Sequence, residues 1–366
     1  NFNFSIFKKP ALYLFLFVFI SLLSIKNSSS FEFSFFQWLK LLEFAVFFFY
    51  LKNYAIYKFG FTNSLYAILF GGLFQSIITV GQFLKQESLG LWFLGESVFN
   101  KDVLGVASFY LSNGDKIIRA YGTAPHSNVL AAYLFLALFC FYFIWFYNRS
   151  SYDKFFLAAH LLTLWAFFLT FSRVAIFTLG INYVVRGCFL FLKFRKLRSK
   201  RVWQIIIYTS IVIAIFSAVY WPEVLARLKI SGDEDAVQLR NFYNRESLGW
   251  LSWTGIGVGN FVNELMTKIP NLPTHMYQPV HNIYLLIYSE TGILGISAFV
   301  LFLVFLVRDF VVRTKLKRSH HYSLLFLFSS YLFMGLFDHF LWTLQTGRFV
   351  FWLVLASVAI KENEDI

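Results

Sequence analysis

Three side chains, far apart along the sequence, carry chemistry that could be combined. His281 stands just before a long apolar segment, at a boundary between water and an expected bilayer. The ordinary pKa of an imidazole, about 6.5, suits it to accept or donate a proton near neutral pH. Arg173 and Arg240 carry permanently charged, planar guanidinium groups that fit phosphate oxygens. These residue types predict proton transfer beside a bound phosphate or diphosphate at a membrane surface.

The composition excludes an ordinary soluble domain. Hydrophobic residues make up 58% of the 366-residue chain and charged residues only 14%. The net charge of +13 would suggest nucleic acid as a partner in a soluble protein, but here many basic residues lie in short loops beside apolar segments. The expected partner is therefore the lipid bilayer and not nucleic acid. Cys140 and Cys188 both fall inside apolar segments, so no disulfide framework is expected.

The apolar segments predict an all-α fold. A bilayer core of about 30 Å needs about 20 apolar residues per helix. We predict about ten membrane helices in one integral membrane domain covering residues 1–366. The predicted helices cover residues 11–25, 35–51, 60–83, 122–147, 155–171, 174–192, 202–221, 283–307, 321–340 and 343–360.

Two basic loops predict the orientation. Residues 193–201 hold six Lys and Arg, and residues 308–318 hold five. Short loops of this kind face the cytoplasm. Residues 222–282, between the seventh and eighth predicted helices, are then external, and so are residues 84–121. Both termini are predicted to be cytoplasmic.

The stretch 155–192 is too long for one membrane helix and has polar residues at its centre. Both of its ends are predicted to be cytoplasmic, which requires an even number of crossings and therefore a helical hairpin. Thr170, Ser172 and Arg173 would form its external tip. The alternative is one tilted helix from which Arg173 extends to the membrane surface.

The external segment contains an amphipathic stretch, Val237 to Trp253, that carries Arg240 and Arg245. A glycine-rich loop follows at Gly255–Asn260. No βαβ pattern surrounds this loop, so close backbone packing is favoured over nucleotide binding. Asp233-Glu234-Asp235 could hold a metal ion, but such a run is more often simply hydrated.

Glu290 lies within the apolar segment that follows His281 and is costly there unless it is paired or protonated. Arg173 is the candidate partner, while Gly292 and Gly295 would let a neighbouring helix approach. Nine residues separate His281 from Glu290, so on a continuous helix the two side chains point to opposite faces.

Four elements resemble the O-antigen ligase/polymerase superfamily of bacterial envelope glycosyltransferases. The most specific is His281-Asn282 with Glu290, Gly292 and Gly295. The others are Thr170-Phe-Ser-Arg173, Arg240 followed by Gly255-Ile-Gly-Val-Gly-Asn-Phe261, and Ala124-Pro-His126-Ser-Asn128. They occur in the family's order between about residues 122 and 300. The short N-terminal half departs from the family, so the acceptor is not carried over.

The resemblance implies a membrane glycosyltransferase of polysaccharide and lipopolysaccharide biosynthesis in the bacterial cytoplasmic membrane. It would move a glycan from an undecaprenyl-diphosphate carrier to the hydroxyl of a lipid, glycan or protein at the external face. His281 would be the general base, and Arg173 and Arg240 would bind the diphosphate. No cofactor and no metal are expected, because the arginines can stabilise the leaving group. Supporting residues would be Glu290, Asn282, Arg245 and Ser172, and weaker candidates are Asp338, His339, His126 and Asn128.

Several alternatives stay open from the sequence. His281 could merely hydrogen-bond a helix start, and Asp338 and His339 could be a capping pair. The enzyme could be a ligase that transfers a finished glycan or a polymerase that extends repeat units. A glycan or lipid transporter is the alternative from another class, because Glu290 lies within the membrane.

Overall fold

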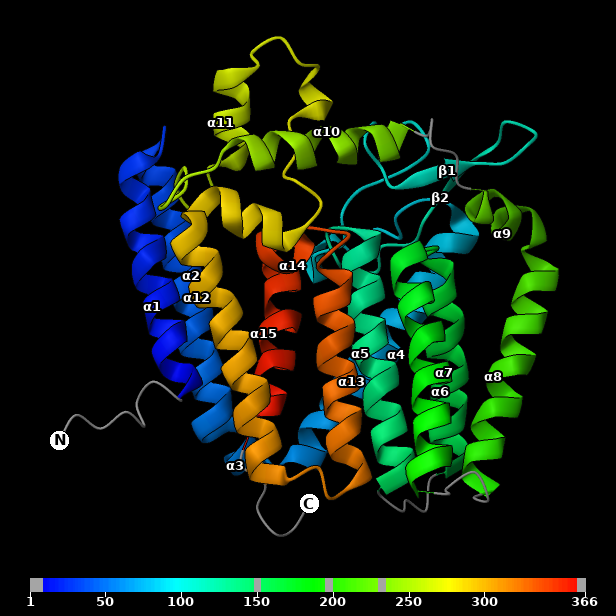
Figure 1. The fold of residues 1–366 in the computed structure, drawn as a ribbon. Coiled ribbons are helices and arrows are strands. Elements are labelled where there is room, and N and C mark those ends of the chain that lie inside the picture. Colours follow the sequence, from blue (N-terminus) through cyan, green and yellow to red (C-terminus); the bar gives the residue numbers. More distant parts are fainter. Residues whose placement is uncertain (1–8, 148–152, 195–199, 230–234, 361–366) are drawn as a thin grey trace. The chain divides into compact units, whose positions relative to one another are not determined.

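Helices dominate the chain in the computed structural model, which describes residues 9–147, 153–194, 200–229 and 235–360 (Figure 1). The chain divides into two units. The first unit comprises residues 1–58, 231–318 and 331–366, and the second comprises residues 59–230 and 319–330. The all-α class is confirmed, with one small hairpin of strands that the sequence did not predict.

The first unit is built around four long helices, α1, α2, α12 and α15, and the shorter helices α10 and α11 lie at one end of them (Figure 1). Its helices are α1 (Pro10–Ser24), α2 (Phe31–Tyr50), α10 (Asp235–Gly249), α11 (Phe261–Lys268), α12 (Ile283–Thr314), α14 (Phe340–Thr343) and α15 (Gln345–Ala359). Short 3₁₀ turns cover Ile25–Asn27 and Thr274–Met276. A π-helical turn at Leu51–Ala55 continues α2 into α3 (Ile56–Phe59).

Aromatic side chains hold the helices of the first unit together. The rings of Tyr13 and Phe305 are stacked with centroids 4.6 Å apart, and those of Phe17 and Phe299 are 5.2 Å apart. Because later residues of α1 meet earlier residues of α12, these two helices run antiparallel (Figure 1). Large apolar side chains supply the dispersion contacts that helices need when both are surrounded by lipid.

The helix α12 is broken at Gly292, whose φ of +72° is not helical. The loop before α11 pairs with the broken turn. Ser289 and Glu290 accept hydrogen bonds through their carbonyls from the N–H groups of Ile256 and Gly257, both 3.0 Å long. On the other side of the break, the N–H groups of Ile293 and Leu294 donate to the carbonyls of Ser252 (3.0 Å) and Trp253 (3.2 Å).

The expected role of Gly292 and Gly295 was therefore wrong. A Cβ at Gly292 would overlap the backbone of Trp253, so this glycine admits a loop and not a neighbouring helix. A Cβ at Gly295 would overlap the side chain of Thr291 in the same helix.

The second unit contains the remaining helices and the strand pair. It consists of α4 (Phe61–Lys85), a 3₁₀ turn (Trp92–Leu94), β1 (Ser108–Tyr110), β2 (Lys116–Ile118), α5 (Ser127–Tyr147), α6 (Asp153–Leu169), α7 (Arg173–Phe194), α8 (Lys200–Val219) and α9 (Trp221–Leu228). The strands are antiparallel, with Phe109 opposite Ile117. The helix α13 (Ser319–Met334) begins in this unit and ends in the first.

The predicted break within residues 155–192 is confirmed. The chain leaves α6 after Leu169, and α7 begins at Arg173. Phe171, between the two helices, has a φ of +45° and is buried among the rings of Phe83, Phe109 and Phe216. The alternative of a single tilted helix was wrong, because the polar residues stop the helix where expected.

The chain is a multi-pass membrane protein. Among the described residues, six helices are long and apolar enough to cross a membrane: Pro10–Asn27, Phe31–Phe59, Phe61–Lys85, Ser127–Tyr147, Lys200–Val219 and Ile283–Thr314. Three shorter apolar helices are Lys154–Leu169, Arg173–Val185 and Gln345–Ala359. The predicted helix at 321–340 is interrupted, because α13 ends at Met334 and a turn leads to α14. Cys140 and Cys188 are both free.

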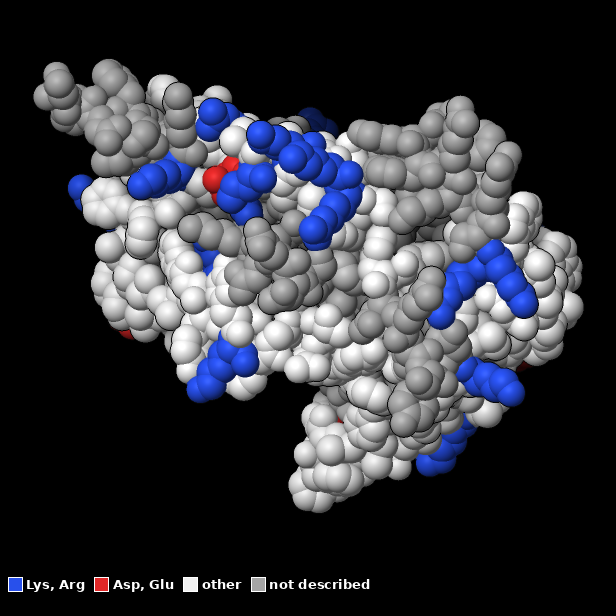
Figure 2. Space-filling model, turned by 90° about the horizontal axis from the view of Figure 1, so that it is seen from below, with Lys and Arg blue, Asp and Glu red and all other residues white. Residues whose placement is uncertain are grey.

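Basic residues gather at one end of the helices. The view from below shows many Lys and Arg side chains and few acidic ones (Figure 2). In the first unit, the carboxyl end of α12 and the turn after it carry Arg308, Arg313, Lys315, Lys317 and Arg318. The basic loop 193–201 falls largely outside the described residues, since 195–199 are not among them.

Replacing Gly292 tests whether the broken helix needs this backbone conformation. We expect Gly292→Ala to lower the free energy of unfolding by about 3 kcal/mol, because alanine is strained at this φ and its Cβ would overlap the Trp253 carbonyl. Thermal unfolding in detergent measures the loss. Gly249→Ala is the matched control, since nothing lies within 4 Å of that position and its φ is not in the left-handed region. Equal stability of the two variants would contradict the assignment.

Candidate active site

His281 is placed by the start of α12. Asn282 is the N-cap residue of this helix, and its side-chain oxygen accepts hydrogen bonds from the N–H groups of Tyr284 (2.9 Å) and Leu285 (3.2 Å). The preceding residue, Val280, is fully buried. The cap therefore belongs to Asn282, and His281 is left with its ring outside the helix. This excludes the alternative in which His281 itself caps the helix start.

Two rings enclose the imidazole of His281. Tyr243, on α10, is stacked with it at 6.0 Å between centroids. His339, just before α14, meets it edge-on at 5.0 Å. Tyr243 is fully buried, and its hydroxyl donates to the carbonyl of Met276 (2.5 Å), which fixes the ring. His281 thus contacts residues of two segments that are distant from it in the sequence, α10 and the turn before α14.

The surroundings keep His281 neutral. Burial lowers the pKa of the imidazole to about 4; the Asp338 carboxylate opposes this shift, while His339 and the Arg240 guanidinium add to it. Its Nδ1 atom is buried and has no hydrogen-bond partner among the described residues. A neutral imidazole with an unused nitrogen can accept a proton from a bound hydroxyl group.

Asp338 and His339 lie at the start of α14 and also approach the site. The Oδ1 atom of Asp338 accepts from the N–H groups of His339 (2.7 Å) and Phe340 (3.4 Å) at the start of α14. The Nδ1 atom of His339 lies 2.7 Å from the Thr343 hydroxyl oxygen. Asp338 thus accepts from N–H groups at the start of α14, whereas the His339 side chain makes no cap hydrogen bond, and the same turn brings Asp338 close enough to influence His281.

The glycine-rich loop packs tightly and is not a nucleotide cradle. Gly255, Gly257 and Gly259 all have positive φ values. A Cβ at these positions would overlap, in that order, the backbone of Glu290, the Ser28 side chain and the Gln37 side chain. The prediction of close backbone packing is confirmed, because the loop fills the space beside the break in α12.

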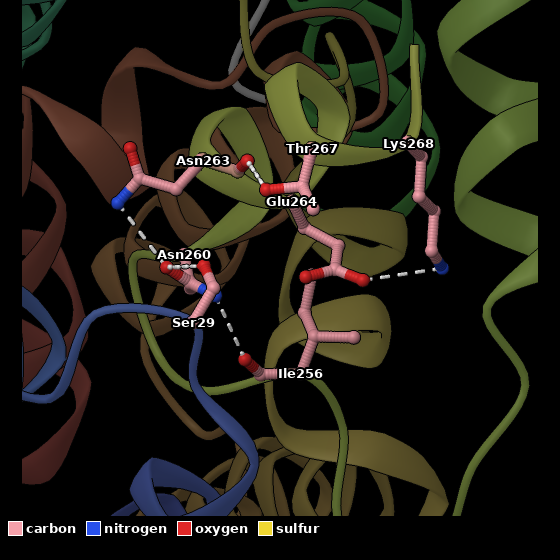
Figure 3. A network of polar contacts seen from close by, with 7 residues as sticks. All are labelled: Ser29, Ile256, Asn260, Asn263, Glu264, Thr267 and Lys268. Atoms are coloured by element: carbon pink, nitrogen blue, oxygen red, sulfur yellow. Dashed lines mark hydrogen bonds and ion pairs between the residues drawn. The ribbon is translucent and has the colours of Figure 1, made fainter. Parts of the chain in front are cut away.

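The turn between α1 and α2 holds the other side of this loop. The Asn27 amide donates to the Thr254 hydroxyl (2.8 Å) and the Gly255 carbonyl (2.9 Å). In the network of Figure 3, the amide of Asn260 donates to the Ser29 hydroxyl (3.0 Å) and to the Ile256 carbonyl (3.1 Å). The loop is thereby tied to the N-terminal helices as well as to α12.

Further along the same network, α11 is stabilised by its own side chains. Asn263 donates to the Asn260 side-chain oxygen (3.2 Å), and the Thr267 hydroxyl donates to the Asn263 carbonyl (3.0 Å). Lys268 and Glu264 form an ion pair at 3.4 Å. These contacts are local and half-exposed, so we assign them to stabilising the segment that leads to His281 and not to chemistry.

Glu290 lies at the centre of a buried polar cluster. Its carboxylate accepts from the indole N–H of Trp342 (3.1 Å) and from the backbone N–H groups of Gly259 and Phe261, and it faces the charge of Arg348. The partner predicted from the sequence, Arg173, is corrected to Arg348, which no motif in the sequence had indicated. Glu290 thus fixes the glycine-rich loop to the broken helix and does not face His281.

Arg348 is itself anchored in the first unit. Its Nη2 atom donates to the Gln37 side chain (2.9 Å), and its Nε atom donates to the Trp342 carbonyl. Gln345, one turn earlier, donates to Glu43 on α2 (3.2 Å). A charged pair buried between helices is expected to be costly unless all its groups are satisfied, and these contacts satisfy most of them.

Arg173 lies in the second unit, at the first position of α7. The three residues before it are held from two sides. Arg119 donates to the Thr170 carbonyl (2.7 Å), and Arg227 donates to the Phe171 carbonyl (3.2 Å). Ser172 is buried, and its carbonyl accepts from Ile176 in the first turn of α7. The break before Arg173 is therefore held by specific hydrogen bonds and is not a frayed helix end.

His126 and Asn128 have structural contacts in the second unit. The Nδ1 atom of His126 accepts from the Asn128 N–H (3.1 Å) before α5 begins. The side-chain oxygen of Asn128 accepts from Arg119 (2.5 Å). These two weak candidates therefore help to position Arg119, which is buried and which the sequence analysis had missed.

The two arginines of α10 differ in exposure. Arg240 is half-buried and close enough to affect His281, whereas Arg245 is exposed. Tyr243, the ring stacked on His281, was also missed. Its spacing of three residues from Arg240 places both on one face of α10, a signal that the sequence did contain.

Among the described residues no group of three or more His, Cys, Asp or Glu side chains could hold a metal ion. The acidic run Asp233-Glu234-Asp235 falls mostly outside the described residues. The charged groups near His281 are Arg240 and Asp338.

Comparison with known families agrees with this geometry. Residues 158–300 match the family model described as O-antigen ligase. The chain carries an O-antigen ligase domain. The matched segment includes the α6–α7 break with Arg173, the helix α10 with Arg240, and His281 with most of the broken helix α12. A search of curated proteins gave no match. The resemblance is confirmed for this O-antigen ligase segment, which contains three of the four sequence elements, and the family implies an enzyme that transfers glycans; Ala124–Asn128 lies outside the match.

Removing one member of the Glu290–Arg348 pair tests its role in the stability of the first unit. We expect Arg348→Gln to lower the free energy of unfolding by roughly 1–3 kcal/mol, because it removes the positive charge that faces buried Glu290 and disturbs the hydrogen bonds of Arg348 to Gln37 and Trp342. The double variant Glu290→Gln with Arg348→Gln should be more stable than the single one. Thermal unfolding of the purified variants measures both, and strictly additive losses would contradict a direct interaction.

Proposed function

We propose that the protein is a ligase-type glycosyltransferase that moves a glycan from an undecaprenyl-diphosphate carrier to an acceptor hydroxyl at the external face of the bacterial cytoplasmic membrane. The observation that carries the proposal is His281: a half-buried, neutral imidazole whose buried Nδ1 atom has no partner among the described residues, near a guanidinium and at the start of a membrane helix. The O-antigen ligase match supports the same chemistry.

His281 acts as the general base. An acceptor hydroxyl binds with its proton directed at the imidazole and attacks the anomeric carbon of the lipid-linked sugar. The proton passes to His281 as the new glycosidic bond forms and the bond to the diphosphate breaks. The Asp338 carboxylate stabilises the imidazolium that results, because it opposes the other influences on the pKa of His281. Direct attack would invert the configuration at the anomeric carbon.

The arginines bind the leaving diphosphate. Arg240 supplies a planar fork of N–H donors near His281, and its charge offsets the negative charge that develops on the diphosphate. Arg173, presented at the start of α7, is proposed as a second guanidinium for the same group. With two arginines in these roles, we expect no metal requirement. Arg245 is assigned to a peripheral position, because its side chain is exposed.

The external location is part of the proposal. Within the first unit, the glycine-rich loop and His281 lie toward one end of α12, and Arg313, Lys315 and Lys317 lie at the other. The positive-inside rule assigns that basic end to the cytoplasm. Both termini would then be cytoplasmic, and residues 222–282 would face outward.

The substitutions at His281 and Arg240 test these roles in membranes supplied with polyprenyl-linked oligosaccharide and acceptor. His281→Gln should abolish transfer, and Arg240→Lys should reduce it by roughly 100-fold, because lysine lacks the bidentate fork. Arg245→Lys should lose far less, since that side chain is exposed. Expression and thermal unfolding serve as controls for folding.

Full activity of His281→Gln would remove the base assignment, and equal effects of the two arginine substitutions would remove the assignment of Arg240. The product distribution decides between the two transferase types. A single transferred block indicates a ligase, and a ladder of repeat lengths indicates a polymerase.

The pH dependence of transfer should follow the pKa of His281. In the free enzyme that pKa is lowered from 6.5 to about 4, so the imidazole is already neutral above this pH. We therefore expect the acidic limb of kcat/KM near pH 4 and not near pH 6.5. The bound diphosphate favours the imidazolium, so the limb of kcat should lie at higher pH.

The direction in which Asp338→Asn shifts the pH profile tests whether His281 is the group that titrates. The Asp338 carboxylate raises the pKa of His281, so its removal should lower that pKa and move the limb of kcat to lower pH. The comparison requires full pH profiles of the wild type and the variant in the same membranes. A limb that stays in place or moves upward would show that another group titrates.

A further inference from the structure

The second unit contains a cavity of about 290 Å³ among α5, α7, α8 and the first part of α13. Its walls are mostly apolar and include Phe135, Phe139, Phe146, Leu179, Ile205 and Phe326. The cavity is open on one side, because Ile206 and Ile213 in its wall are exposed, and apolar walls of this kind do not hold water. A space of this size between membrane helices therefore calls for an apolar occupant.

The shape of the cavity follows from how α8 is attached. At its first turn, the guanidinium of Arg201 lies over the ring of Trp145 (5.2 Å) and donates to the Trp145 carbonyl (2.9 Å). Near its other end, the Phe216 ring contacts Trp165 (5.2 Å) and Phe168 (5.3 Å). Between these two attachments, fifteen residues apart and so about 22 Å along the helix, one face of α8 lines the cavity.

That face is a regular stripe of α8. Its positions recur every three or four residues, which is the spacing of one side of a helix. The lining residues of α8 are Val202, Ile205, Ile206, Thr209, Ser210 and Ile213. The stripe has the sequence pattern of a helix–helix interface but faces a cavity. An apolar chain lying along it would complete the packing.

The polar groups of the wall are mostly used within the protein. Asn182 donates to the Ser330 hydroxyl (2.7 Å) and to the Thr178 carbonyl (2.9 Å). The hydroxyls of Tyr142 and Tyr183 are bonded to each other. Of the described groups lining the cavity, only the Thr209 hydroxyl is buried without a partner. The wall therefore offers little to a polar ligand.

Basic residues at one end of the cavity favour a bound lipid whose head group is negatively charged. Phe146, Gly187 and Val202 place that end beside the start of α8, where Lys200 and Arg201 stand. Basic residues at the membrane surface next to a pocket between helices bind anionic lipid head groups. No acidic residue lines the cavity among the residues that the structure describes.

We propose that this cavity is a binding site for an anionic phospholipid of the leaflet that contacts Lys200 and Arg201. One fatty-acyl chain would lie along the inward stripe of α8, and the phosphate would lie near the two basic side chains. The lipid would act as a structural ligand that completes the packing of α8. The proposal is independent of the transfer chemistry, because it involves neither His281 nor the arginines assigned to the diphosphate.

Two glycines of α7 provide a matched pair of test variants. Gly187 lines the cavity, and nothing lies within 4 Å of a Cβ built there, so the side chain of Gly187→Leu has open space at its base and would occupy part of the cavity. Gly180 lies two turns earlier on the same helix, also has open space, and does not line the cavity. Gly180→Leu therefore adds the same side chain to the same helix and leaves the cavity open.

The experiment measures lipid bound to the full-length protein after purification in mild detergent. Native mass spectrometry should detect retained phosphatidylglycerol on the wild type and on Gly180→Leu, and its loss from Gly187→Leu. Added phosphatidylglycerol should raise the unfolding temperature of the first two proteins but not of the third. Phosphatidylcholine should have a smaller effect on all three, because its head group carries no net charge.

Lys200→Gln tests the head-group end. We expect phosphatidylglycerol affinity to fall about fivefold, which corresponds to the ~1 kcal/mol contributed by one basic residue at an anionic surface.

Equal retention of phosphatidylglycerol by Gly187→Leu and Gly180→Leu would overturn the site. Equal retention of phosphatidylcholine and phosphatidylglycerol would overturn the choice of an anionic lipid. Retention of a polyprenyl lipid, lost in Gly187→Leu, would overturn the choice of a phospholipid.

Discussion

The structure of the first unit depends on one constraint: backbone polar groups inside a membrane must find partners within the protein. The break at Gly292 frees carbonyls and N–H groups of α12, and the loop from Ser252 to Gly257 supplies their partners on both sides of the break. The glycines of the loop allow this close approach. The segment between α10 and α11 is thereby joined to a membrane helix by backbone hydrogen bonds and not only by side chains.

The environment of His281 depends on that connection. The loop leads from α10, which carries Tyr243 and Arg240, and its pairing with α12 fixes where α10 can lie. Glu290 strengthens the junction, since its carboxylate takes hydrogen bonds from Trp342 and from loop amides and faces Arg348. Burial by these elements keeps the imidazole neutral, which is the state that a proton acceptor requires.

Much of the site was predictable because its residues occupy positions that local chemistry restricts. A polar run inside an apolar stretch predicted the helix break before Arg173, and the isolated His281 before an apolar helix predicted an interfacial group. The partner of Glu290 was mispredicted for a physical reason. In a membrane any buried cation can neutralise a carboxylate, and the sequence gives no distance between α12 and α15.

The sequence by itself determined that this chain is a multi-pass helical membrane protein, since apolar length needs no partner to be recognised, and it predicted His281, Arg173 and Arg240 as candidate site residues from their types alone. Only the tertiary structure decided that Tyr243, His339 and Asp338 surround His281, that the glycine-rich loop fills a broken helix, and that α8 borders a cavity. Those outcomes depend on packing between segments distant in sequence, where the free energy comes from shape and burial and not from local pattern.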